Sequence, residues 1–528
     1  MTQPASSPPM TTPAMLAASA AAFGARPALL DGDVQLSYAA LAAAVRTATR
    51  ALIATGVAPG DKVAIWAPNQ WEWVVAALAA HEAGAALVPI STRFKGHEAG
   101  DLLARSGART LFTVRGFLGT DYPDLLEAAG APLPPTTIVM RGTPSDGTRD
   151  WHSFIAAGAK VPDSVAAARA AAVRPEALSD IIYTSGTTGR AKGVMCTHAQ
   201  SVRVFRVWAD TVGLGADDRY LVVAPFFHTF GYKAGFLAGL MTGCAVLPQA
   251  VFDAGAVLAR IAADRVSVLP GPPTLYQSLL AHPERAGHDL GSLRLAVTGA
   301  AVVPVELVHR MRDELGFDTV LTAYGLTEST GVVTMCRPGD DAETIATTSG
   351  RAIAEVEVRV VDDAGAEVAR GQPGEIWVRG YNVMAGYLDD PAETAAAIGD
   401  GWLRTGDIGV MDARGYLRIT DRKKDMFIVG GFNAYPAEIE AALRAHPAIA
   451  EVAVVGAPDE RLGEIGVAFV VARAGTLADP AEIIEWSRAR MANYKVPRRV
   501  EVVNALPVNA SGKVLKFELR KMACGSRS

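Results

Sequence analysis

Apolar residues along the first 330 positions alternate between a helical period and short continuous runs. The stretches from Ser37 to Thr55 and from Trp71 to Glu82 have helical spacing, and a glycine follows each of them. Short apolar runs at Val63 to Trp66 and Ala86 to Ile90 are typical of buried strands. A strand, a helix and a second strand in this order predict parallel pairing and therefore an α/β architecture.

The same alternation continues toward residue 330. Between 115 and 176 the pattern is weak, apart from a strand at 137–140, and we interpret this part as a surface excursion. The remaining predicted strands are 110–114, 220–224, 245–247, 266–269, 293–297 and 319–322, and the remaining helices are 199–211, 234–240, 254–263, 274–280 and 305–315. The pattern predicts doubly wound sheets, in which a ligand lies beyond the carboxyl ends of the strands.

Past residue 330 the pattern changes twice. Antiparallel-type strands at 356–361 and 375–379 predict a smaller β-rich subdomain, and after a charge run at 421–425 a further α+β pattern begins. We therefore predict an α/β fold with a large N-terminal domain and a small, mobile C-terminal domain. The expected divisions are a disordered N-terminus (1–13), an N-terminal ATP- and acyl-binding domain (14–421), a hinge (422–424) and a C-terminal lid domain (425–528).

One loop between two apolar runs combines the residues that bind phosphate. Backbone N–H groups of a glycine-rich turn form an anion-binding concavity, hydroxyls add donors, and a lysine adds a point charge. It is not a Walker A loop, because Ala191 and Gly193 replace the glycine and the hydroxyl residue which that motif requires. The alternative is a polar hairpin loop without a ligand. The loop residues in question are Thr184, Ser185, Gly186, Thr187, Thr188, Gly189 and Lys192.

Composition and charge exclude several classes of partner. The chain has 528 residues, half of them hydrophobic, and a net charge of −5 without a basic block, so nothing indicates a nucleic-acid partner. No apolar run is long enough to span a bilayer, and the first residues lack the basic start of a secretory signal. Four widely spaced cysteines argue against a zinc site and for a reducing compartment, so we expect a cytoplasmic protein.

The stretch Thr184-Ser185-Gly186-Thr187-Thr188-Gly189-Arg190-Ala191-Lys192-Gly193 resembles the phosphate loop of the adenylate-forming superfamily of acyl-CoA synthetases, adenylation domains and luciferases. The resemblance extends from about Ser37 to Arg520 and implies ATP, Mg²⁺ and coenzyme A as cofactors, with a carboxylic acid as substrate. Thr184 and Glu328 would hold magnesium, a role that suits a carboxylate at a strand end beside a phosphate loop. Asp407 and Arg422 would contact the ribose. The segments expected around the nucleotide are Gly299-Ala300 and Tyr324-Gly325-Leu326-Thr327.

The resemblance also assigns residues to the C-terminal domain. Lys424 falls at the hinge about which this domain is thought to swing between two catalytic arrangements. Gly430 and Gly431 would line the pantetheine tunnel, and glycines suit such a close backbone approach. Lys513, in the segment Pro507 to Lys513, would reach the acyl-adenylate and act as a catalytic residue together with Thr184, Glu328 and His228.

The acid side of the site is expected in the segment 226–235. By resemblance His228 separates the acyl pocket from the CoA tunnel, and Phe227, Tyr232, Lys233, Gly299 and Gly325 would also meet the acid. This segment and residues 116–122 are similar to those of actinobacterial ligases of steroid degradation, which load a methylated diketo-hydrindane propanoate onto CoA. Phe226, Phe227, Phe230 and Tyr232 would supply aromatic walls, and Tyr232 and Lys233 donors for ring ketones. The alternative for Lys233 is a side chain that reaches solvent from a helix start.

Three functional hypotheses remain open from the sequence. The preferred one is an ATP-dependent, AMP-forming acyl-CoA ligase acting on a steroid-derived ring propanoate, and its near variants act on fatty or aromatic acids. A second is an adenylating enzyme that loads a carrier protein, and a third is a catalytically silent nucleotide-binding protein. The acid itself and the oligomeric state, including a homodimer, are left open by the sequence.

Overall fold

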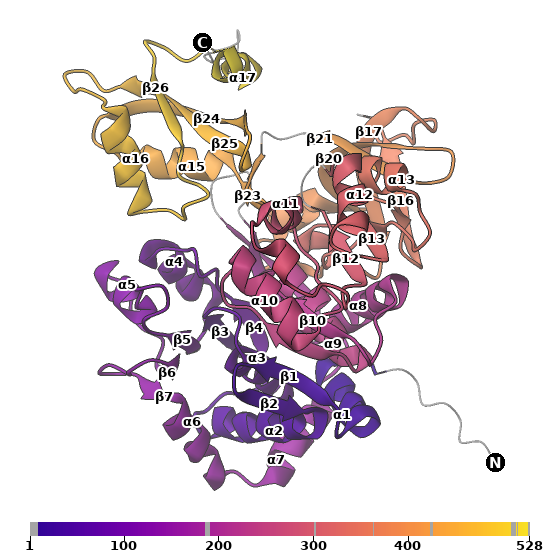
Figure 1. The fold of residues 1–528 in the computed structure, drawn as a ribbon. Coiled ribbons are helices and arrows are strands. Elements are labelled where there is room, and N and C mark those ends of the chain that lie inside the picture. Colours follow the sequence, from indigo (N-terminus) through magenta and orange to yellow (C-terminus); the bar gives the residue numbers. More distant parts are fainter. Residues whose placement is uncertain are drawn as a thin grey trace.

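The computed structural model of the protein describes residues 9–184, 191–299, 303–362, 364–422, 426–507, 514 and 516–525, without the side chains of 420–422, 433, 437 and 517. Within these residues the chain forms a large N-terminal domain and a small C-terminal domain that lies at one end of it (Figure 1). The predicted α/β architecture is confirmed.

A sheet that is eight-stranded over the described residues leads to the phosphate loop. Its order is β18-β9-β8-β4-β3-β5-β6-β7, parallel from β8 to β7, while β9 and β18 are antiparallel to their neighbours. The strands are β3 (Lys62–Trp66), β4 (Ala86–Pro89), β5 (Thr110–Val114), β6 (Thr136–Arg141), β7 (Arg149–Asp150), β8 (Leu178–Thr184), β9 (Lys192–Thr197) and β18 (Gly386–Tyr387). The accompanying helices are α2 (Tyr38–Ala54), α3 (Trp71–Glu82), α4 (Gly96–Ser106) and α8 (His198–Val212).

Two further strand groups carry the other half of the N-terminal domain. Their orders over the described residues are β10-β11-β1-β2 and β12-β13-β14-β15, and Val268 bridges β10 and β12 in parallel. The strand expected at 266–269 is thus a single bridging residue. The strands are β1 (Pro27–Asp31), β2 (Val34–Ser37), β10 (Arg219–Val222), β11 (Ala245–Pro248), β12 (Leu295–Thr298), β13 (Thr319–Tyr324), β14 (Thr334–Met335) and β15 (Arg351–Ala352). The helices are the π-helix η2 (Phe230–Leu237), α9 (Ala238–Thr242), α10 (Ala254–Asp264), α11 (Pro273–Ala281), α12 (Val305–Asp313) and α13 (Ala342–Thr347), with short 3₁₀ turns η3 (Arg285–Gly287) and η4 (Thr327–Ser329).

The predicted β-rich subdomain is an antiparallel sheet in which β16, β17, β20 and β19 are neighbours and β21 pairs with β20. These strands are β16 (Val356–Val361), β17 (Pro373–Gly380), β19 (Ile398–Gly399), β20 (Trp402–Met411) and β21 (Leu417–Arg422), and α14 (Pro391–Ala397) precedes β19.

The C-terminal domain packs helices on a mixed sheet of order β23-β22-β25-β24, with β26 parallel to β25. Its elements are β22 (Phe427–Val429), β23 (Phe432–Ala434), α15 (Pro436–Leu443), β24 (Ile449–Asp459), β25 (Gly463–Ala472), α16 (Pro480–Arg488), β26 (Arg499–Val502) and α17 (Lys516–Gly525).

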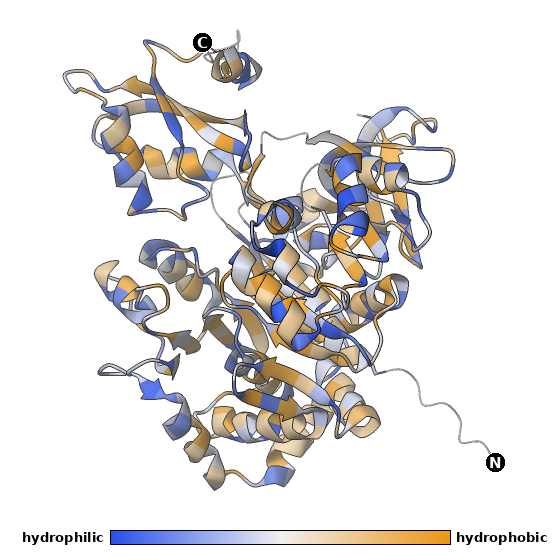
Figure 2. Ribbon diagram, viewed as in Figure 1, coloured by the Kyte–Doolittle hydropathy of each residue, from blue (hydrophilic) through white to orange (hydrophobic). Residues whose placement is uncertain are grey.

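The hydrophobic core is divided between the two domains. A large cluster of buried side chains runs from Met15 to Leu417, and separate clusters begin at Phe427. Hydrophobic residues gather on the strands and the inner faces of helices, whereas outer faces such as that of α12 are hydrophilic (Figure 2). The change of core falls in the interval that contains the expected hinge at 422–424.

Helices without a clear polar face were missed by the sequence analysis. The weak region 115–176 contains α5 (Tyr122–Ala128), α6 (Trp151–Ala157), η1 (Gly158–Lys160) and α7 (Asp163–Ala172). Another, α1 (Thr12–Phe23), begins inside the stretch 1–13 that was expected to be disordered, and the Thr11 hydroxyl caps its first turn. The expectation of disorder was therefore wrong for residues 12 and 13, because an alanine-rich helix gives little periodic signal.

Candidate active site

The ends of β8 and β13 bring the expected metal-binding residues together. The Thr184 hydroxyl lies 3.4 Å from Oε1 of Glu328 and donates to it, and the Tyr387 hydroxyl donates to the same oxygen at 3.0 Å. Glu328 lies in η4, directly after β13, so the two loops meet at the carboxyl edge of their sheets. The site therefore presents a carboxylate and two hydroxyl oxygens beside the phosphate loop.

The expected ribose contacts are neighbours across two antiparallel strands. Asp407 on β20 is paired in register with Arg422 on β21. The Asp407 carboxylate is buried, and its Oδ2 accepts a hydrogen bond of 2.6 Å from the Tyr324 hydroxyl. Tyr324 and Asp407 come from different sheets, so this bond joins the β-rich subdomain to the end of β13.

Lys192 is held beside this group. Its ammonium forms an ion pair with Glu393 of α14 and lies 5.0 Å from the centre of the Tyr387 ring. Lys192 is the first residue of β9, so its charge lies at the edge of the phosphate loop. Its side chain is 13% exposed, and the charge is therefore partly shielded from solvent. Tyr387 and Glu393 were not singled out from the sequence, since their neighbours here come from distant segments.

Several of the expected glycines are required by the folded chain itself. A Cβ at Gly325 would lie 2.2 Å from the carbonyl oxygen of Gly331, which only a glycine avoids. At Gly299 a Cβ would lie 3.1 Å from the Ala323 oxygen, a tight but less severe approach. Gly430 and Gly431 have φ values of +55° and +83°, and a Cβ at Gly431 would lie 3.6 Å from Cβ of Pro272. The turn that carries them thus faces the start of α11 in the N-terminal domain.

The segment that precedes η2 is fixed by Asn69. The Asn69 amide donates to the carbonyl oxygens of Val222 and Ala224 at 3.0 and 2.9 Å, and its oxygen accepts the Phe226 N–H at 2.7 Å. Asn69 was also missed from the sequence, because an asparagine before a helix is usually read as a turn residue.

His228 follows in this segment as an exposed side chain, and Phe227 beside it is half-buried. The backbone N–H of Phe230 donates to Nδ1 of His228 at 3.2 Å, so the neutral ring carries its proton on Nε2. Although the side chain has an exposed surface, the protein packed around the ring partly desolvates it and lowers the pKa of His228. The ring is therefore a neutral N–H donor at pH 7.

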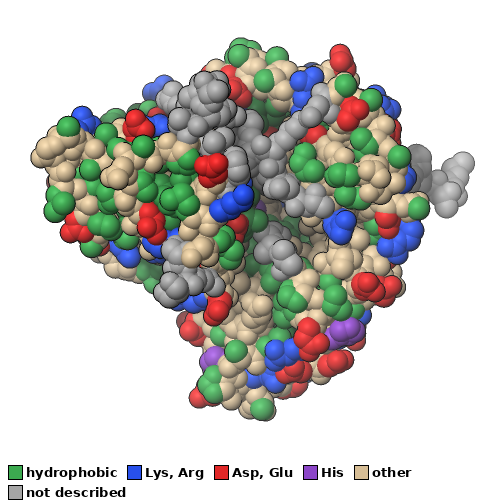
Figure 3. Space-filling model, turned by 90° about the horizontal axis from the view of Figure 1, so that it is seen from above, with side chains coloured by type: hydrophobic (Ala, Val, Ile, Leu, Met, Phe, Trp, Pro, Cys, Tyr) green, Lys and Arg blue, Asp and Glu red, His purple; other side chains and the backbone are tan. Residues whose placement is uncertain are grey.

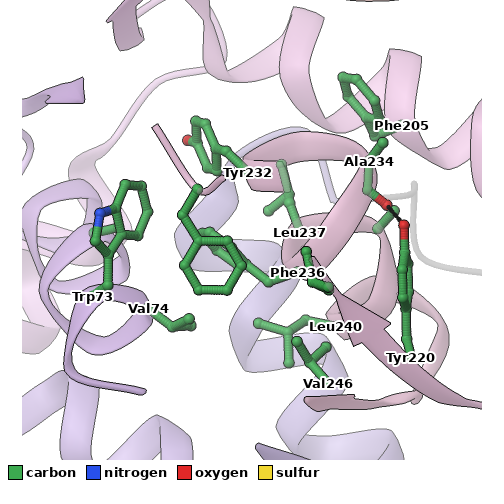
Figure 4. Packing of buried hydrophobic residues seen from close by; sticks show 14 of the residues in the cluster. Trp73, Val74, Phe205, Tyr220, Tyr232, Ala234, Phe236, Leu237, Leu240 and Val246 are labelled. Atoms are coloured by element: carbon green, nitrogen blue, oxygen red, sulfur yellow. Dashed lines mark hydrogen bonds between the residues drawn. The ribbon is translucent and has the colours of Figure 1, made fainter. Parts of the chain in front are cut away.

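Tyr232 and Lys233, which were expected to meet the acid, are fully buried in the folded chain. Both side chains are 0% exposed. Tyr232 packs with Trp73 and Phe236 (Figure 4). Its hydroxyl lies 3.3 Å from Nε2 of His81. These contacts place Tyr232 in the core instead of on a pocket wall.

The ammonium of Lys233 lies 2.9 Å from Oδ1 of Asp180, which is also fully buried. Burial disfavours the lysine charge, but the interactions of its ammonium with Asp180 and Cys196 together outweigh this effect and raise the pKa of Lys233. The alternative that Lys233 reaches solvent is wrong, because its side chain is 0% exposed. The sequence missed Asp180, because an aspartate inside an apolar strand gives no sign of its partner.

Part of the expected site lies outside the described residues. These are Ser185, Gly186, Thr187, Thr188 and Gly189 of the phosphate loop, Ala300, the hinge residue Lys424 and Lys513, together with the side chain of Arg422. The flanking residues Thr184, Lys192 and Gly299 are described, and they border the group around Glu328.

Three features of the described residues bear on other classes of function. His, Cys, Asp and Glu side chains in the described part of the chain do not gather in threes that would hold a metal ion. Among the described helices, none combines the length and the apolar character that a bilayer crossing requires. On the face seen in Figure 3, basic and acidic side chains are interspersed instead of gathered by sign.

The comparisons with known proteins agree with this geometry. Residues 16–388 match the family described as AMP-binding enzyme, and residues 438–513 match the AMP-binding enzyme C-terminal domain. The chain belongs to the AMP-binding enzyme family, and it is an AMP-forming acid–thiol ligase.

Two relatives share about half of its residues. The chain is 54% identical to the 3-[(3aS,4S,7aS)-7a-methyl-1,5-dioxo-octahydro-1H-inden-4-yl]propanoyl:CoA ligase of Mycobacterium tuberculosis, over 94% of this chain and 95% of that one. It is 51% identical to the ligase of the same name from Rhodococcus jostii, over 97% and 99%.

Solved structures of one further enzyme, o-succinylbenzoate CoA synthetase (MenE) from Bacillus subtilis, are similar in two ligand states. A double mutant bound to its product analogue OSB-NCoA superposes with a TM-score of 0.83 at 29% identity, covering 96% of this chain and 98% of that one. MenE in complex with the acyl-adenylate intermediate OSB-AMP superposes with a TM-score of 0.67 at 30% identity, covering 96% and 97%.

Proposed function

We propose that this ligase attaches coenzyme A to a propanoate borne by a methylated bicyclic dione, the acid for which its two relatives are named. The observation that carries the proposal is the identity of 54% and 51% to those ligases over nearly the whole length of both chains. Identity of this extent includes the segments on both sides of the proposed acid site, not the nucleotide site alone.

In the first step a carboxylate oxygen of the acid attacks the α-phosphate of ATP. The bond to the β-phosphate breaks, and acyl-adenylate and pyrophosphate form. Charge stays on phosphate oxygens, so the protein acts by positioning and by placing donors. In this proposal Lys192 and Lys513 supply positive charge, the Thr184 and Thr327 hydroxyls supply donors, and Asp407 with Arg422 holds the ribose.

Magnesium suits the described oxygen donors. Mg²⁺ is bound through one or two carboxylates plus substrate phosphates, and Glu328 with the Thr184 hydroxyl provides such a half-site. When bound there, the ion would neutralise phosphate charge. The proposed task of Thr184 and Tyr387 is to orient the Glu328 carboxylate through their hydrogen bonds to Oε1.

In the second step the thiol of coenzyme A attacks the acyl carbonyl, the bond to AMP breaks, and the thioester forms. We assign the pantetheine path to the turn at Gly430 and Gly431, which faces Pro272. His228 would stand where this path meets the acid, with its Nε2 proton available to an acceptor.

The acid would lie against Phe227 and Phe230, which are half-buried, and His228. Two aromatic faces and a neutral N–H donor match an apolar ring body that carries ketone acceptors. A fatty acid offers no acceptor for that donor along its chain. A cytoplasmic location and a homodimer complete the proposal.

Steady-state kinetics of the purified protein test the substrate. With ATP, Mg²⁺ and CoA we expect the ring acid to be converted with a kcat/KM at least roughly fivefold above those of palmitate and benzoate, since one satisfied donor is worth about 1 kcal/mol. A preference for palmitate or benzoate would overturn the substrate assignment. Holo-carrier protein replaces CoA in a parallel reaction, and faster acyl transfer to the carrier would overturn the CoA assignment.

A further inference from the structure

A nearly buried lysine joins the C-terminal domain to helix α4 of the N-terminal domain. Lys495 follows α16, and its side chain is 3% exposed. Its ammonium lies 2.8 Å from Oε1 of Glu98 on α4 and 2.5 Å from Oε1 of Glu438 on α15. Glu438 belongs to the same domain as Lys495, whereas Glu98 belongs to the other domain, so one of the two ion pairs crosses the junction.

Aromatic side chains surround this ion pair on both sides of the junction. The ammonium of Lys495 lies 4.7 Å from the ring centre of Phe94, and the guanidinium of Arg93 lies 3.7 Å above the ring of Phe432. Tyr494 packs against Phe432 in a tilted arrangement, with ring centres 5.1 Å apart. These rings shield the ion pair from water, which strengthens it.

Glu98 is held by a contact within its own helix, α4, in addition to its ion pair with Lys495. Its second oxygen, Oε2, accepts the backbone N–H of Lys95 at 3.0 Å and thereby caps the first turn of α4. A carboxylate that is already oriented loses little rotamer entropy when the lysine docks on it.

Rotation of the C-terminal domain would break one ion pair and keep the other. Lys495 and Glu438 would move together, but Glu98 would stay on α4. The bond between Glu98 and Lys495 is therefore available only in the present arrangement of the domains. Such a contact stabilises the present arrangement of the domains relative to the rotated one, and it shifts the equilibrium between them by the free energy of the contact.

Two observations connect this arrangement with the CoA step. The same docking places the Gly430–Gly431 turn against Pro272 at the start of α11. The whole chain also superposes better on MenE bound to its CoA product analogue, with a TM-score of 0.83, than on MenE bound to its acyl-adenylate, with 0.67.

We propose that Glu98 and Lys495 are positioning residues for the second half-reaction, and that their ion pair, backed by Glu438, holds the C-terminal domain in the arrangement for CoA transfer. The proposal rests on the two-step reaction of the proposed function. Neither residue touches the reacting atoms, so both act through the placement of the Gly430–Gly431 turn.

The kinetic test is Glu98→Gln, which keeps an oxygen for the helix cap and removes the charge. Starting from preformed acyl-adenylate, we expect the single-turnover rate of CoA transfer to fall roughly five- to fiftyfold. The first-turnover release of pyrophosphate should be unchanged. The matched control is Glu127→Gln on neighbouring α5, an exposed carboxylate, and it should leave both rates as in the wild type. Equal loss in both half-reactions, or no loss in CoA transfer, overturns the proposal.

A distance measurement tests the domain arrangement without turnover. Spin labels are placed at Leu118→Cys and Leu477→Cys, two side chains that are 73% and 87% exposed in different domains, in a Cys524→Ser background. The remaining cysteines are buried. We expect one dominant label distance with CoA in the wild-type background and a second population when Glu98→Gln is added.

An unchanged distance distribution in Glu98→Gln overturns the ion pair as the holding contact. Because this readout needs no acid, it remains valid if the ring acid is not the substrate. Lys495→Met completes a double-mutant cycle. If the pair acts as one unit, adding Glu98→Gln to Lys495→Met should slow CoA transfer no further, and additive losses would contradict the pairing.

Discussion

Replacement of Lys233 by methionine should destabilise the N-terminal domain instead of changing which acid the enzyme prefers. Lys233 and Asp180 form an ion pair of 2.9 Å in which both side chains are 0% exposed. Ser179 and Ser201 donate to the other carboxylate oxygen at 2.6 and 3.3 Å. Lys233→Met removes the cation and leaves an ionised carboxylate that only hydroxyls solvate.

The expected cost follows from this burial. Removal of one partner of a buried pair costs about 3 to 5 kcal/mol, whereas replacement of both partners by apolar residues is often neutral. The free energy of unfolding, measured by urea denaturation of the N-terminal domain, should therefore fall by about 3 to 5 kcal/mol in Lys233→Met. Most of this loss should be recovered in Asp180→Leu/Lys233→Met.

An exposed pair supplies the control. Arg379 and Glu357 lie 2.7 Å apart with side chains 42% and 56% exposed, so Arg379→Met should cost less than about 1 kcal/mol. The interpretation of Lys233 as a structural partner of Asp180 is refuted if Lys233→Met unfolds at the same urea concentration as the wild type and loses activity only toward the ring acid. Lys233 would then act as a substrate donor, as the sequence analysis expected.

Three further outcomes are expected from the site and the core. Lys513→Ala should abolish pyrophosphate release on addition of acid and ATP but spare CoA transfer from preformed acyl-adenylate, and near wild-type adenylation would show that the C-terminal motif is assigned wrongly. Gly431→Leu should release pyrophosphate once per site and then stall, since a side chain there meets Pro272 at a φ of +83°, and equal loss of both half-reactions would instead mark a folding defect. Burial lowers the pKa of His81 from 6.5 to about 4, so the unfolded chain binds this proton more readily than the folded protein does. The free energy of unfolding should therefore fall by about 3 kcal/mol between pH 7 and pH 4, and His81→Gln should lack this contribution.

The sequence predicted the elements whose patterns are local. Helix α3 begins and ends at the expected Trp71 and Glu82, since apolar spacing and the following Gly84 define it. Strand β5 spans the expected residues 110–114, which form one short buried run. The alanine-rich helix α7 escaped detection because it buries only Ala166 among the side chains that its residues present. Val268 was predicted to lie in a four-residue strand, but it forms isolated bridges. The apolar pattern of a buried run does not show how many of its residues pair with neighbouring strands.

The candidate site was predictable where each residue belongs to a local motif to which the family resemblance assigns a role. Thr184 and Glu328 were both expected at the magnesium site, and their oxygens are 3.4 Å apart. The sequence alone did not identify partners that no motif assigns. Examples are the Tyr387 hydroxyl, which donates to Glu328, and Asp180, which forms the ion pair with Lys233. A lysine that follows an aromatic segment is easily interpreted as a donor for a ligand. The structure shows instead that the carboxylate of Asp180 on β8 neutralises its charge.

A competition experiment tests the central claim most directly. The protein is given equal concentrations of the ring propanoate, palmitate, benzoate and indoleacetate with limiting CoA, and the thioesters are quantified by mass spectrometry together with AMP. The account predicts that the ring propanoyl-CoA forms first and in excess, with one AMP released for each thioester. A product mixture dominated by another acyl-CoA, or thioester formed without AMP, would contradict it.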